Sequence, residues 1–582
     1  MKAKRSIAAF VFTALAMTLS QAQEIKVPLR FDFYYSYDKV TEALKALNTA
    51  YPDLTTLEQV GKSEEGRIIW ALTINNPKTG APLTKPAIYA DGNIHGNEIQ
   101  AGEVCLYLAN RLLTNYGKLK EITEVVDRNA FYIIPVVNVD GRAHFFGDAN
   151  TPSSNRGLRI PLDDDRDGLY DEDGPDDLDG DGNITTMRMR DTLGTMKSDP
   201  EDPRLMVPVK PGEKGEWTTL GQEGIDNDGD GRMNEDSEGF VDGNRNWAYN
   251  WNPPYAQNGA GMYPFQGTGI RAIAEWMMAR PNIIMVFAFH NTGGMYLRGP
   301  SFKSAGELPQ GDISVYNYLG QNIEKIVPGY KYLISWKDLY TTYGDFTDFT
   351  NNLLGSYSFV GELFQVETET YDGTLMRKEA GRSMFGASPE ADRQRLQFSD
   401  HVTQGELYKD WKPYQHPVYG DIELGGWVKM SSRLPHPFML QDLVHRNASA
   451  VIFAAGNTPD VEMDVFEVKK IEGDLWRIRV RLVNDGAMPS VTFQTIKNKL
   501  YPQDILSVSG ASATVVSGGR ISDLYTGQVD YKEYKPSVQF CQVPGFGKVD
   551  YQFLVSGKGS VEVKFESRKA GSIVKSVKLS DK

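Results

Sequence analysis

The run Pro86-Ala-Ile-Tyr-Ala-Asp-Gly-Asn-Ile-His95-Gly-Asn-Glu98 joins an apolar segment to a turn that carries a histidine and a carboxylate three residues apart. A second apolar run, Ile283-Ile-Met-Val-Phe-Ala-Phe, ends at His290. A spacing of three lets two side chains converge from one turn. Imidazole nitrogen and carboxylate oxygen suit Zn²⁺, and three protein ligands leave a fourth position open for water. We therefore predict that His95, Glu98 and His290 hold a catalytic zinc ion.

Apolar segments and helical patterns alternate through the first three quarters of the chain. Strands are expected at 66–74, 86–90, 131–137, 283–289 and 357–363, and helices at 37–51 and at about 97–114. Strands this apolar indicate a sheet that is covered on both faces. We predict an α/β fold with a mixed, mostly parallel sheet flanked by helices. Ligand sites in such sheets lie at the carboxyl ends of the strands, which is where His95 and His290 fall.

The sequence changes character after about residue 455. Between Trp476 and Leu482, apolar residues alternate with arginines, and Val561, Val563 and Phe565 alternate with charged residues. This period of two, with Gly-rich turns, predicts a separate antiparallel β-sandwich. Roughly 560 mature residues are too many for one core, so at least two domains are expected. The predicted organisation is a signal peptide at 1–22, an α/β domain at 23–454 with an acidic insertion at about 160–240, and an all-β sandwich domain at 455–582.

The N-terminus has the pattern of an export signal. Met1-Lys-Ala-Lys-Arg5 is basic, residues 6–19 are almost wholly apolar, and Ser20-Gln-Ala22 is a small-x-small cleavage site. We expect an exported protein, periplasmic or extracellular and of bacterial origin, without a membrane span. The two cysteines, Cys105 and Cys541, are expected to be buried free thiols. The net charge of −14 argues against nucleic acid as a partner.

Several other polar residues are candidates for catalytic or substrate-binding roles. Glu362 lies inside Tyr357-Ser-Phe-Val-Gly-Glu-Leu, where a carboxylate is costly to bury unless it is paired or used. Asn244-Arg245 follows Gly239-Phe-Val-Asp-Gly, and Arg159 closes Asn155-Arg-Gly-Leu-Arg. For Glu362 alone, a salt-bridged glutamate at a strand end is the ordinary alternative.

From residue 24 to about 450, this order resembles that of the zinc metallocarboxypeptidases of the carboxypeptidase A type. Their pattern of H-x-x-E, Arg, N-R, a lone His, Tyr and Glu is matched by His95, Glu98, Arg159, Asn244, Arg245, His290, Tyr340 and Glu362. Tyr340 precedes Glu362 by twenty-two residues, which is the family's own interval, and Asp348-Phe349 falls where an Asp-aromatic pair is expected. Asn97 departs from the pattern, because many members carry an Arg there that contacts the substrate.

The resemblance implies a metallocarboxypeptidase-like fold and zinc-dependent hydrolysis of C-terminal residues from peptides. Glu362 would act as general base and Arg159 would stabilise the oxyanion. Asn244 and Arg245 would hold the free C-terminal carboxylate of a peptide substrate, and Tyr340 would close over it. Thr347 falls where the family has the floor of its specificity pocket, and a small neutral residue there sets no basic or acidic preference.

The insertion is strongly acidic, with eleven acids and one base between residues 163 and 181. The pattern D-x-D-x-D-G occurs three times, and oxygen ligands at positions 1, 3, 5 and 9 with Gly at 6 form a Ca²⁺ loop. Position 12 holds Gly174, Arg188 and Ser237 instead of Glu. The candidate calcium ligands are Asp163, Asp165, Asp167, Asp171, Asp177, Asp179, Asp181, Asp226, Asp228, Asp230 and Asn234. The first and third loops share an Asp/Asn-Glu-Asp tail, which suggests a pair; a disordered acidic loop is the alternative.

Two other functions are compatible with these residues. One is a cell-wall (murein) peptide hydrolase with the same site. The other is a catalytically inactive, calcium-dependent protein that binds peptides or glycans. The complete set of His95, Glu98, His290 and Glu362 argues against inactivity, because an inactive homologue commonly loses the base.

Overall fold

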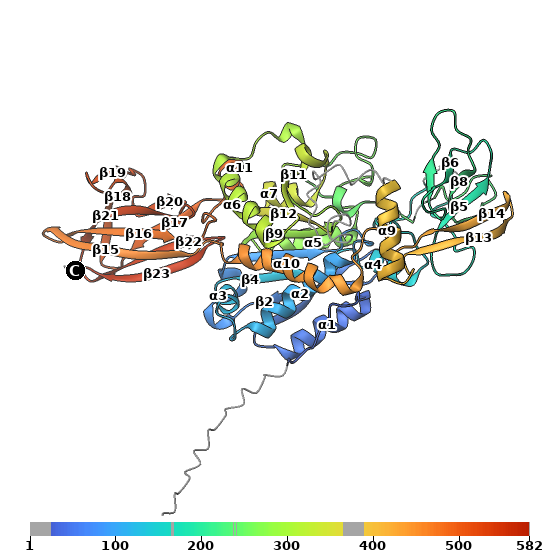
Figure 1. Ribbon diagram of the computed structural model, residues 1–582. Helices are drawn as coiled ribbons and strands as arrows, with labels where there is room; N and C mark the ends of the chain where they lie inside the picture. Colours follow the sequence, from blue (N-terminus) through green and yellow to red (C-terminus); the bar gives the residue numbers. More distant parts are fainter. Residues whose placement is uncertain (1–24, 164–167, 237, 240, 365–388, 581–582) are drawn as a thin grey trace, which may run out of the picture.

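The computed structural model describes residues 25–163, 168–236, 238–239, 241–364 and 389–580. It consists of three parts in a row: a central α/β part, a β-sandwich formed by the C-terminal residues, and a smaller sheet at the opposite end (Figure 1). The predicted signal peptide lies outside the described residues. Within the described ranges, no helix combines the length and the apolar character that a membrane crossing requires.

The central sheet has eight strands in the order β1-β2-β4-β3-β9-β12-β10-β11. The four middle strands β4, β3, β9 and β12 are parallel to one another. Antiparallel pairs join β1 to β2, β2 to β4, and β10 to β12. The sheet is therefore mixed and mostly parallel, as predicted. Its strands are β1 (Thr55–Lys62), β2 (Ile68–Ile74), β3 (Ala87–Gly92), β4 (Ala130–Ile134), β9 (Ile283–Asn291), β10 (Met295–Arg298), β11 (Lys331–Ile334) and β12 (Tyr357–Leu363).

Helices cover this sheet. They are α1 (Tyr37–Ala50), α2 (Gln100–Asn115), α3 (Lys120–Arg128), α4 (Val139–Gly147), α5 (Thr268–Met278), α6 (Gln310–Ile326), α7 (Phe346–Leu353) and α10 (Pro437–Ala455). α2 and α10 pack on each other and both contact β9, so they cover the same face of the sheet (Figure 1). α5 contacts β1, and α7 contacts β12. This packing brings the carboxyl ends of β3, β9 and β12 to one edge, where parallel sheets bind ligands.

The smaller sheet is antiparallel and has six strands in the order β13-β14-β5-β8-β6-β7. It comprises β5 (Thr186–Arg190), β6 (Met196–Ser198), β7 (Met206–Pro208), β8 (Trp217–Gln222), β13 (Tyr408–His416) and β14 (Gly420–Trp427), and α9 (Pro389–Val402) precedes β13. Two distant segments thus share one sheet, with Glu423 of β14 opposite Arg188 of β5. The Arg188 guanidinium lies 3.8 Å from the ring centres of both Trp217 and Trp411. The predicted insertion therefore contains folded strands that its acidic composition did not indicate.

The C-terminal part is the predicted β-sandwich. Its antiparallel sheets have the orders β15-β16-β21-β18-β19 and β20-β17-β22-β23. Ile478 from the first sheet and Val563 from the second belong to one buried core. The elements are β15 (Val461–Glu472), β16 (Leu475–Asn484), α11 (Phe493–Asn498), β17 (Asp504–Ser509), β18 (Ala513–Asp523), β19 (Gln528–Tyr531), β20 (Val538–Cys541), β21 (Gly547–Gly557), β22 (Ser560–Ser567) and β23 (Gly571–Lys578). Cys541 here and Cys105 in α2 are buried free thiols, as expected.

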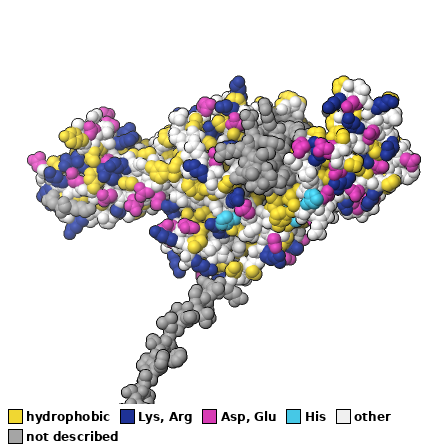
Figure 2. Space-filling view, in the orientation of Figure 1, with side chains coloured by type: hydrophobic (Ala, Val, Ile, Leu, Met, Phe, Trp, Pro, Cys, Tyr) yellow, Lys and Arg dark blue, Asp and Glu magenta, His cyan; other side chains and the backbone are white. Residues whose placement is uncertain are grey.

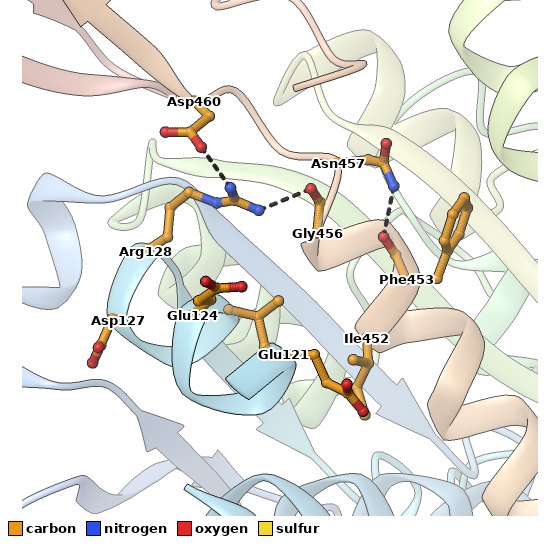
Figure 3. A pocket seen from close by; sticks show the side chains of 10 residues that line it. Glu121, Glu124, Asp127, Arg128, Ile452, Phe453, Gly456, Asn457 and Asp460 are labelled. Carbon is orange, nitrogen blue, oxygen red and sulfur yellow. Dashed lines mark hydrogen bonds and ion pairs between the residues drawn. The ribbon is translucent and has the colours of Figure 1, made fainter. Parts of the chain in front are cut away.

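A cleft of about 770 Å³ marks the junction between the central part and the sandwich (Figure 3). Arg128 at the end of α3 crosses this junction, because its Nη1 atom lies 2.7 Å from Asp460 Oδ2 and its Nη2 atom donates to Gly456 O at 2.8 Å. Elsewhere at the junction, the buried Lys569 ammonium donates to Ile283 O at the start of β9. Basic and acidic side chains are interspersed over the sandwich on the face shown in Figure 2.

Candidate active site

The three predicted zinc ligands converge at the carboxyl edge of the central sheet. His95 and Glu98 lie in the turn between β3 and α2, and His290 lies near the end of β9. The two Nδ1 atoms of the histidines are 3.2 Å apart. Glu98 places Oε1 at 3.0 Å from His95 Nδ1 and Oε2 at 3.1 Å from His290 Nδ1. All three side chains are buried, with 1 to 3 % of each exposed.

This geometry fits a zinc ion. A tetrahedral zinc with ligand distances of about 2.1 Å separates its ligand atoms by about 3.4 Å, close to the spacing seen here. Burial opposes ionisation of Glu98, but the facing imidazoles of His95 and His290 outweigh it and hold the pKa of Glu98 well below its usual range. An ionised carboxylate and two imidazoles in one buried cluster are the donor set that Zn²⁺ prefers.

Asp242 orients the His95 ring, although it lies outside the motif pattern that predicts the other site residues. The His95 Nε2 atom lies 2.9 Å from Asp242 Oδ1, so the ring donates there and turns Nδ1 toward the other two ligands. Burial opposes ionisation of Asp242, yet the charges of His95, Arg245 and Arg156 hold its pKa well below the ordinary value. In the sequence, the only indication of this role was the position of Asp242, an acid two residues before Asn244-Arg245.

Glu362 lies beside the histidine ligand of β9. Glu362, on β12, is in register with His290 on the neighbouring parallel strand β9, so both side chains point to the same face of the sheet. Burial raises the pKa of Glu362 to about 7, the charge of His290 lowers it, and that of Glu98 raises it further. A carboxyl group with such a pKa can accept a proton and return it near neutral pH.

Two arginines occupy the run that was expected to supply the oxyanion-binding group. Arg156 Nη1 lies 3.2 Å from Glu98 Oε1, and Arg156 Nη2 lies 3.2 Å from Asp242 Oδ2. Arg159, the residue predicted for this role, instead places Nε 3.3 Å from Glu65 Oε1. The structure therefore brings Arg156 to the metal centre and places Arg159 in an ion pair with Glu65.

The predicted substrate-binding residues line the same region. Arg245 is mostly buried, and its Nη1 atom donates to Asn244 O at 2.7 Å. Asn244 Oδ1 accepts from the backbone N–H of Phe346 at 2.9 Å, which ties this segment to the start of α7. Tyr340 is 39 % exposed. Partial burial raises the pKa of Tyr340, and the nearby charges of Arg245 and Glu362 also act on this pKa.

Two buried acids flank Thr347, the predicted floor of the specificity pocket. Asp345 caps α7 by accepting from the N–H of Asp348 at 3.0 Å, and Asp348 accepts from the N–H of Ser301 at 3.0 Å. Burial raises the pKa of both carboxyls, and Asp345 raises that of Asp348 further. Both carboxyls are therefore engaged by backbone N–H groups beside Thr347.

The acidic loops of the insertion approach one another. Asp171 N–H donates to Asp236 Oδ2 at 3.0 Å, and Asn234 N–H donates to Asp173 Oδ1 at 3.2 Å, so the first and third loops form the expected pair. Carboxylates also gather in three groups, which are Asp173 with Asp226 and Asp228, Asp177 with Asp179 and Glu223, and Asp228 with Asp230 and Glu235. Among the predicted ligands, Asp165 and Asp167 lie outside the described residues. The sequence pattern missed Asp173, Glu223 and Glu235.

A family described as Zinc carboxypeptidase matches residues 40–160 and 218–376. These two segments contain the three predicted zinc ligands as well as Arg156, Asp242, Arg245 and Glu362. The chain belongs to the zinc carboxypeptidase family. The gap between the segments, 161–217, falls in the acidic insertion. Residues 460–578 match a Domain of unknown function (DUF8731), which coincides with the sandwich.

Individual proteins match this chain over shorter stretches. Human carboxypeptidase D is 39 % identical over 109 residues, which are 19 % of this chain and 8 % of that protein. Carboxypeptidase B of Astacus astacus is 37 % identical over 115 residues, 20 % of this chain and 36 % of that one. The chain thus spans well under half the length of these relatives. The carboxypeptidase A structure from Helicoverpa armigera covers 75 % of this chain and 78 % of its own, with 17 % identity and a TM-score of 0.42.

Proposed function

We propose that this protein is an exported zinc-dependent carboxypeptidase that releases C-terminal residues from peptides. The observation that carries the proposal is the buried convergence of His95, Glu98 and His290, with the Glu362 carboxyl beside it on the adjacent strand. Membership of the zinc carboxypeptidase family supports the same reaction class. An ion held by these three residues would supply Lewis acidity and lower the pKa of a bound water.

Other side chains at the site supply the remaining functions that the reaction requires. Glu362 accepts a proton from the attacking water and later passes it to the leaving amine. Arg156, whose Nη1 atom lies 3.2 Å from Glu98 Oε1, would stabilise negative charge that develops on the scissile carbonyl oxygen, the role that the sequence resemblance assigned to Arg159. Asp242 keeps the His95 ring in one tautomer throughout.

Arg245 and Asn244 would hold the C-terminal carboxylate of the substrate. A guanidinium binds a carboxylate through two parallel hydrogen bonds, and Arg245 is anchored by its bond to Asn244 O so that it presents a fixed face. Tyr340, which is partly exposed and feels the charges of Arg245 and Glu362, would cover a bound residue. Peptides that end in an amide would lose the charge that this arrangement recognises.

The first prediction tests the reaction with Glu362→Gln. The zinc-loaded wild-type protein should release C-terminal amino acids from a panel of peptides, and amidated peptides should resist. Loss of the base should lower kcat/KM by about 10²- to 10⁴-fold, while zinc content is unchanged. Glu42→Gln, on the exposed side of α1, is the matched control and should behave as wild type. Zinc binding without any release of amino acids would contradict the proposal and favour a non-catalytic peptide-binding protein.

We also propose that the paired acidic loops bind Ca²⁺. Asp226 and Asp228 of the third loop face the fully buried Asp173 from the first. Burial raises the pKa of Glu235 beside them, and the charges of Asp173 and Asp230 raise it further. Such a concentration of negative oxygen atoms suits a hard divalent cation. The second loop is a weaker candidate, because Lys409 Nζ lies 3.0 Å from Asp181 Oδ2.

The second prediction is that Ca²⁺ raises the melting temperature of the zinc-loaded protein. Titration calorimetry with Ca²⁺ alone should detect binding, and Asp226→Asn combined with Asp228→Asn should abolish both effects because two charged ligands are lost. Asp53→Asn, on an exposed turn after α1, should change neither. An unchanged melting temperature and no heat of binding in the wild type would refute calcium binding.

Export is proposed from the N-terminal pattern of residues 1–22 alone. Expression of the full chain in a bacterial host should yield a mature protein that begins after Ala22 and is found outside the cytoplasm. Mass spectrometry of the intact protein measures the new N-terminus, and an uncleaved chain in the cytoplasm would reject export.

A further inference from the structure

The segment 428–436, between β14 and α10, reaches the active site from a part of the chain that the motif pattern does not include. The backbone carbonyl of Arg433 accepts from Gln100 Nε2 at 3.1 Å and from Asn291 Nδ2 at 3.0 Å. Tyr34 donates from its hydroxyl to Pro435 O at 2.6 Å. These bonds hold the backbone at Arg433 against α2 and the end of β9, the elements that flank the zinc ligands.

The Arg433 side chain points at the metal centre. Its Nη2 atom donates to Asn291 O at 3.2 Å and lies 3.6 Å from Glu98 Oε1. Arg156 Nη1 approaches the same oxygen atom at 3.2 Å. About a quarter of each arginine side chain is exposed, so both can be reached from solvent. The positive charge of Arg433 also acts on the Glu362 carboxyl.

The contacts of Arg433 differ from those of a structural ion pair in this protein. Arg204 and Asp400 form two parallel hydrogen bonds of 3.0 and 2.6 Å, and Arg481 and Asp550 form two of 2.7 and 2.9 Å. Arg433 instead meets Glu98 through one long contact. A guanidinium has five N–H donors, so this geometry leaves Arg433 with donors for a ligand.

The charges of the site support a second arginine with a role in binding. Three carboxylates surround the metal centre, those of Glu98, Asp242 and Glu362, and three guanidiniums accompany them, those of Arg156, Arg245 and Arg433. These six groups carry no net charge when Glu362 is ionised. A divalent cation makes the site positive, and the positive excess grows when Glu362 takes the proton of the attacking water. The site therefore favours the negative charges of the peptide, which are its C-terminal carboxylate and the developing oxyanion.

We propose that Arg433 is a substrate-contacting residue whose guanidinium binds the oxygen of the scissile carbonyl together with Arg156. The inference rests on the proposed carboxypeptidase function. Two guanidiniums that reach one oxygen atom of Glu98 can also reach one substrate oxygen placed next to it. Preorganised donors at this oxygen stabilise the transition state more than the ground state.

The test compares Arg433→Met with Arg446→Met in the zinc-loaded full chain. Arg446 is an arginine of α10 that pairs with Asp442 on the surface. The probe is an N-acylated dipeptide analogue in which a phosphonate replaces the scissile peptide group and so carries the oxyanion. Calorimetry measures its Kd and that of a free amino acid, chelator competition measures zinc affinity, and peptide hydrolysis is assayed in parallel.

Arg433→Met should raise the Kd of the phosphonate by about 10- to 100-fold. Affinities for zinc and for the free amino acid should stay at the wild-type level, because Glu98 and Arg245 are untouched. Arg433→Lys should recover part of the loss, since an ammonium keeps the charge without the fork of donors. Arg446→Met should match the wild type in every measurement.

Three results would overturn the proposal. The first is an Arg433→Met protein that binds the phosphonate as tightly as the wild type does. The second is a zinc affinity of Arg433→Met that falls by the same factor as its phosphonate affinity, which would make Arg433 a residue that only positions Glu98. The third is a zinc-loaded wild type that does not bind the phosphonate. Failure of the proposed function is distinct: a wild type that binds the phosphonate through Arg433 but releases no amino acid would refute the carboxypeptidase and leave the Arg433 contact standing.

Discussion

At the scale of single residues, the metal centre depends on neighbours that are not themselves ligands. His95 can present Nδ1 to the ion because Asp242 accepts a hydrogen bond from Nε2. Asp242 in turn is held by Arg156 at 3.2 Å, and Arg156 contacts Glu98 with its other nitrogen. One network of charge-assisted hydrogen bonds therefore orients two of the three ligands.

The third prediction concerns this network. Asp242→Asn keeps an oxygen that can accept from His95 but removes the charge, and Asp242→Ala removes both. We expect zinc affinity to fall by about 10- to 100-fold in the alanine variant and by less in the asparagine variant. Competition with a chromogenic chelator measures this. Equal zinc affinity in all three proteins would show that Asp242 does not support the ligand.

At the scale of elements, the turn between β3 and α2 is packed against two other backbone segments. A Cβ atom on Gly96 would lie 2.3 Å from Asn155 O and 2.5 Å from Gly141 C. Only glycine fits there, because backbone atoms cannot move aside as a flexible side chain can. The H-x-x-E turn and the Asn155-Arg156 segment are thus held in contact, and this contact delivers Arg156 to Glu98.

The fourth prediction is that Gly96→Ala separates these segments. We expect a loss of about 1 to 3 kcal/mol in stability from the forced backbone shift, with a parallel loss of zinc affinity because His95 and Glu98 flank the residue. Gly147→Ala at the end of α4 is the control, since a Cβ there meets nothing within 4 Å. Denaturant unfolding and zinc titration measure the two effects. A Gly96→Ala protein as stable as the control would contradict the packing argument.

At the scale of the whole molecule, the β-sandwich is joined to the central sheet through buried polar contacts. Lys569 inserts a fully buried ammonium beside Ile283 O and within 3.4 Å of Ser356 Oγ, at the amino ends of β9 and β12. The other charged group that acts on it is Arg568, and the Tyr501 ring lies 5.9 Å away. Burial lowers the pKa of Lys569 to about 7, and Arg568 lowers it further.

The fifth prediction follows from this pKa. The unfolded chain binds the Lys569 proton up to its ordinary pKa of 10.5, whereas the folded chain releases it near 7. Stability therefore rises with pH across that interval, and the cost of burying the charge is present in full below about pH 7. Relative to wild type, Lys569→Met should be most favoured at about pH 6 and lose that advantage by about pH 10.

Denaturant unfolding of the two proteins across this pH range measures the difference, and the comparison cancels the titration of every other group. Lys558→Met replaces a lysine whose side chain is 78 % exposed, and its difference from wild type should not depend on pH in this way. Parallel stability curves for wild type and Lys569→Met would show that Lys569 stays charged in the folded protein.

Local sequence patterns were enough to predict many elements and the zinc ligands. The apolar run Tyr357–Leu363 is β12 with the predicted ends, and the amphipathic pattern at 37–51 is α1 within one residue. His95, Glu98 and His290 were identified because their residue types and spacing reflect the ion's own coordination preferences. Patterns of this kind are short-range, so they can be read before the chain is folded.

Only the tertiary structure decided which of Arg156 and Arg159 faces the metal centre, and that Asp242 and Arg433 belong there. Arg156 and Arg159 lie in one short segment, and which side chain turns inward depends on the loop conformation, including the left-handed Asn155 at φ 60°. Arg433 is 335 residues from Glu98 along the chain, and Arg188 of β5 is 235 residues from its partner Glu423 of β14. Such contacts depend on strand order and on packing between distant segments, and neither can be predicted from local residue periodicity.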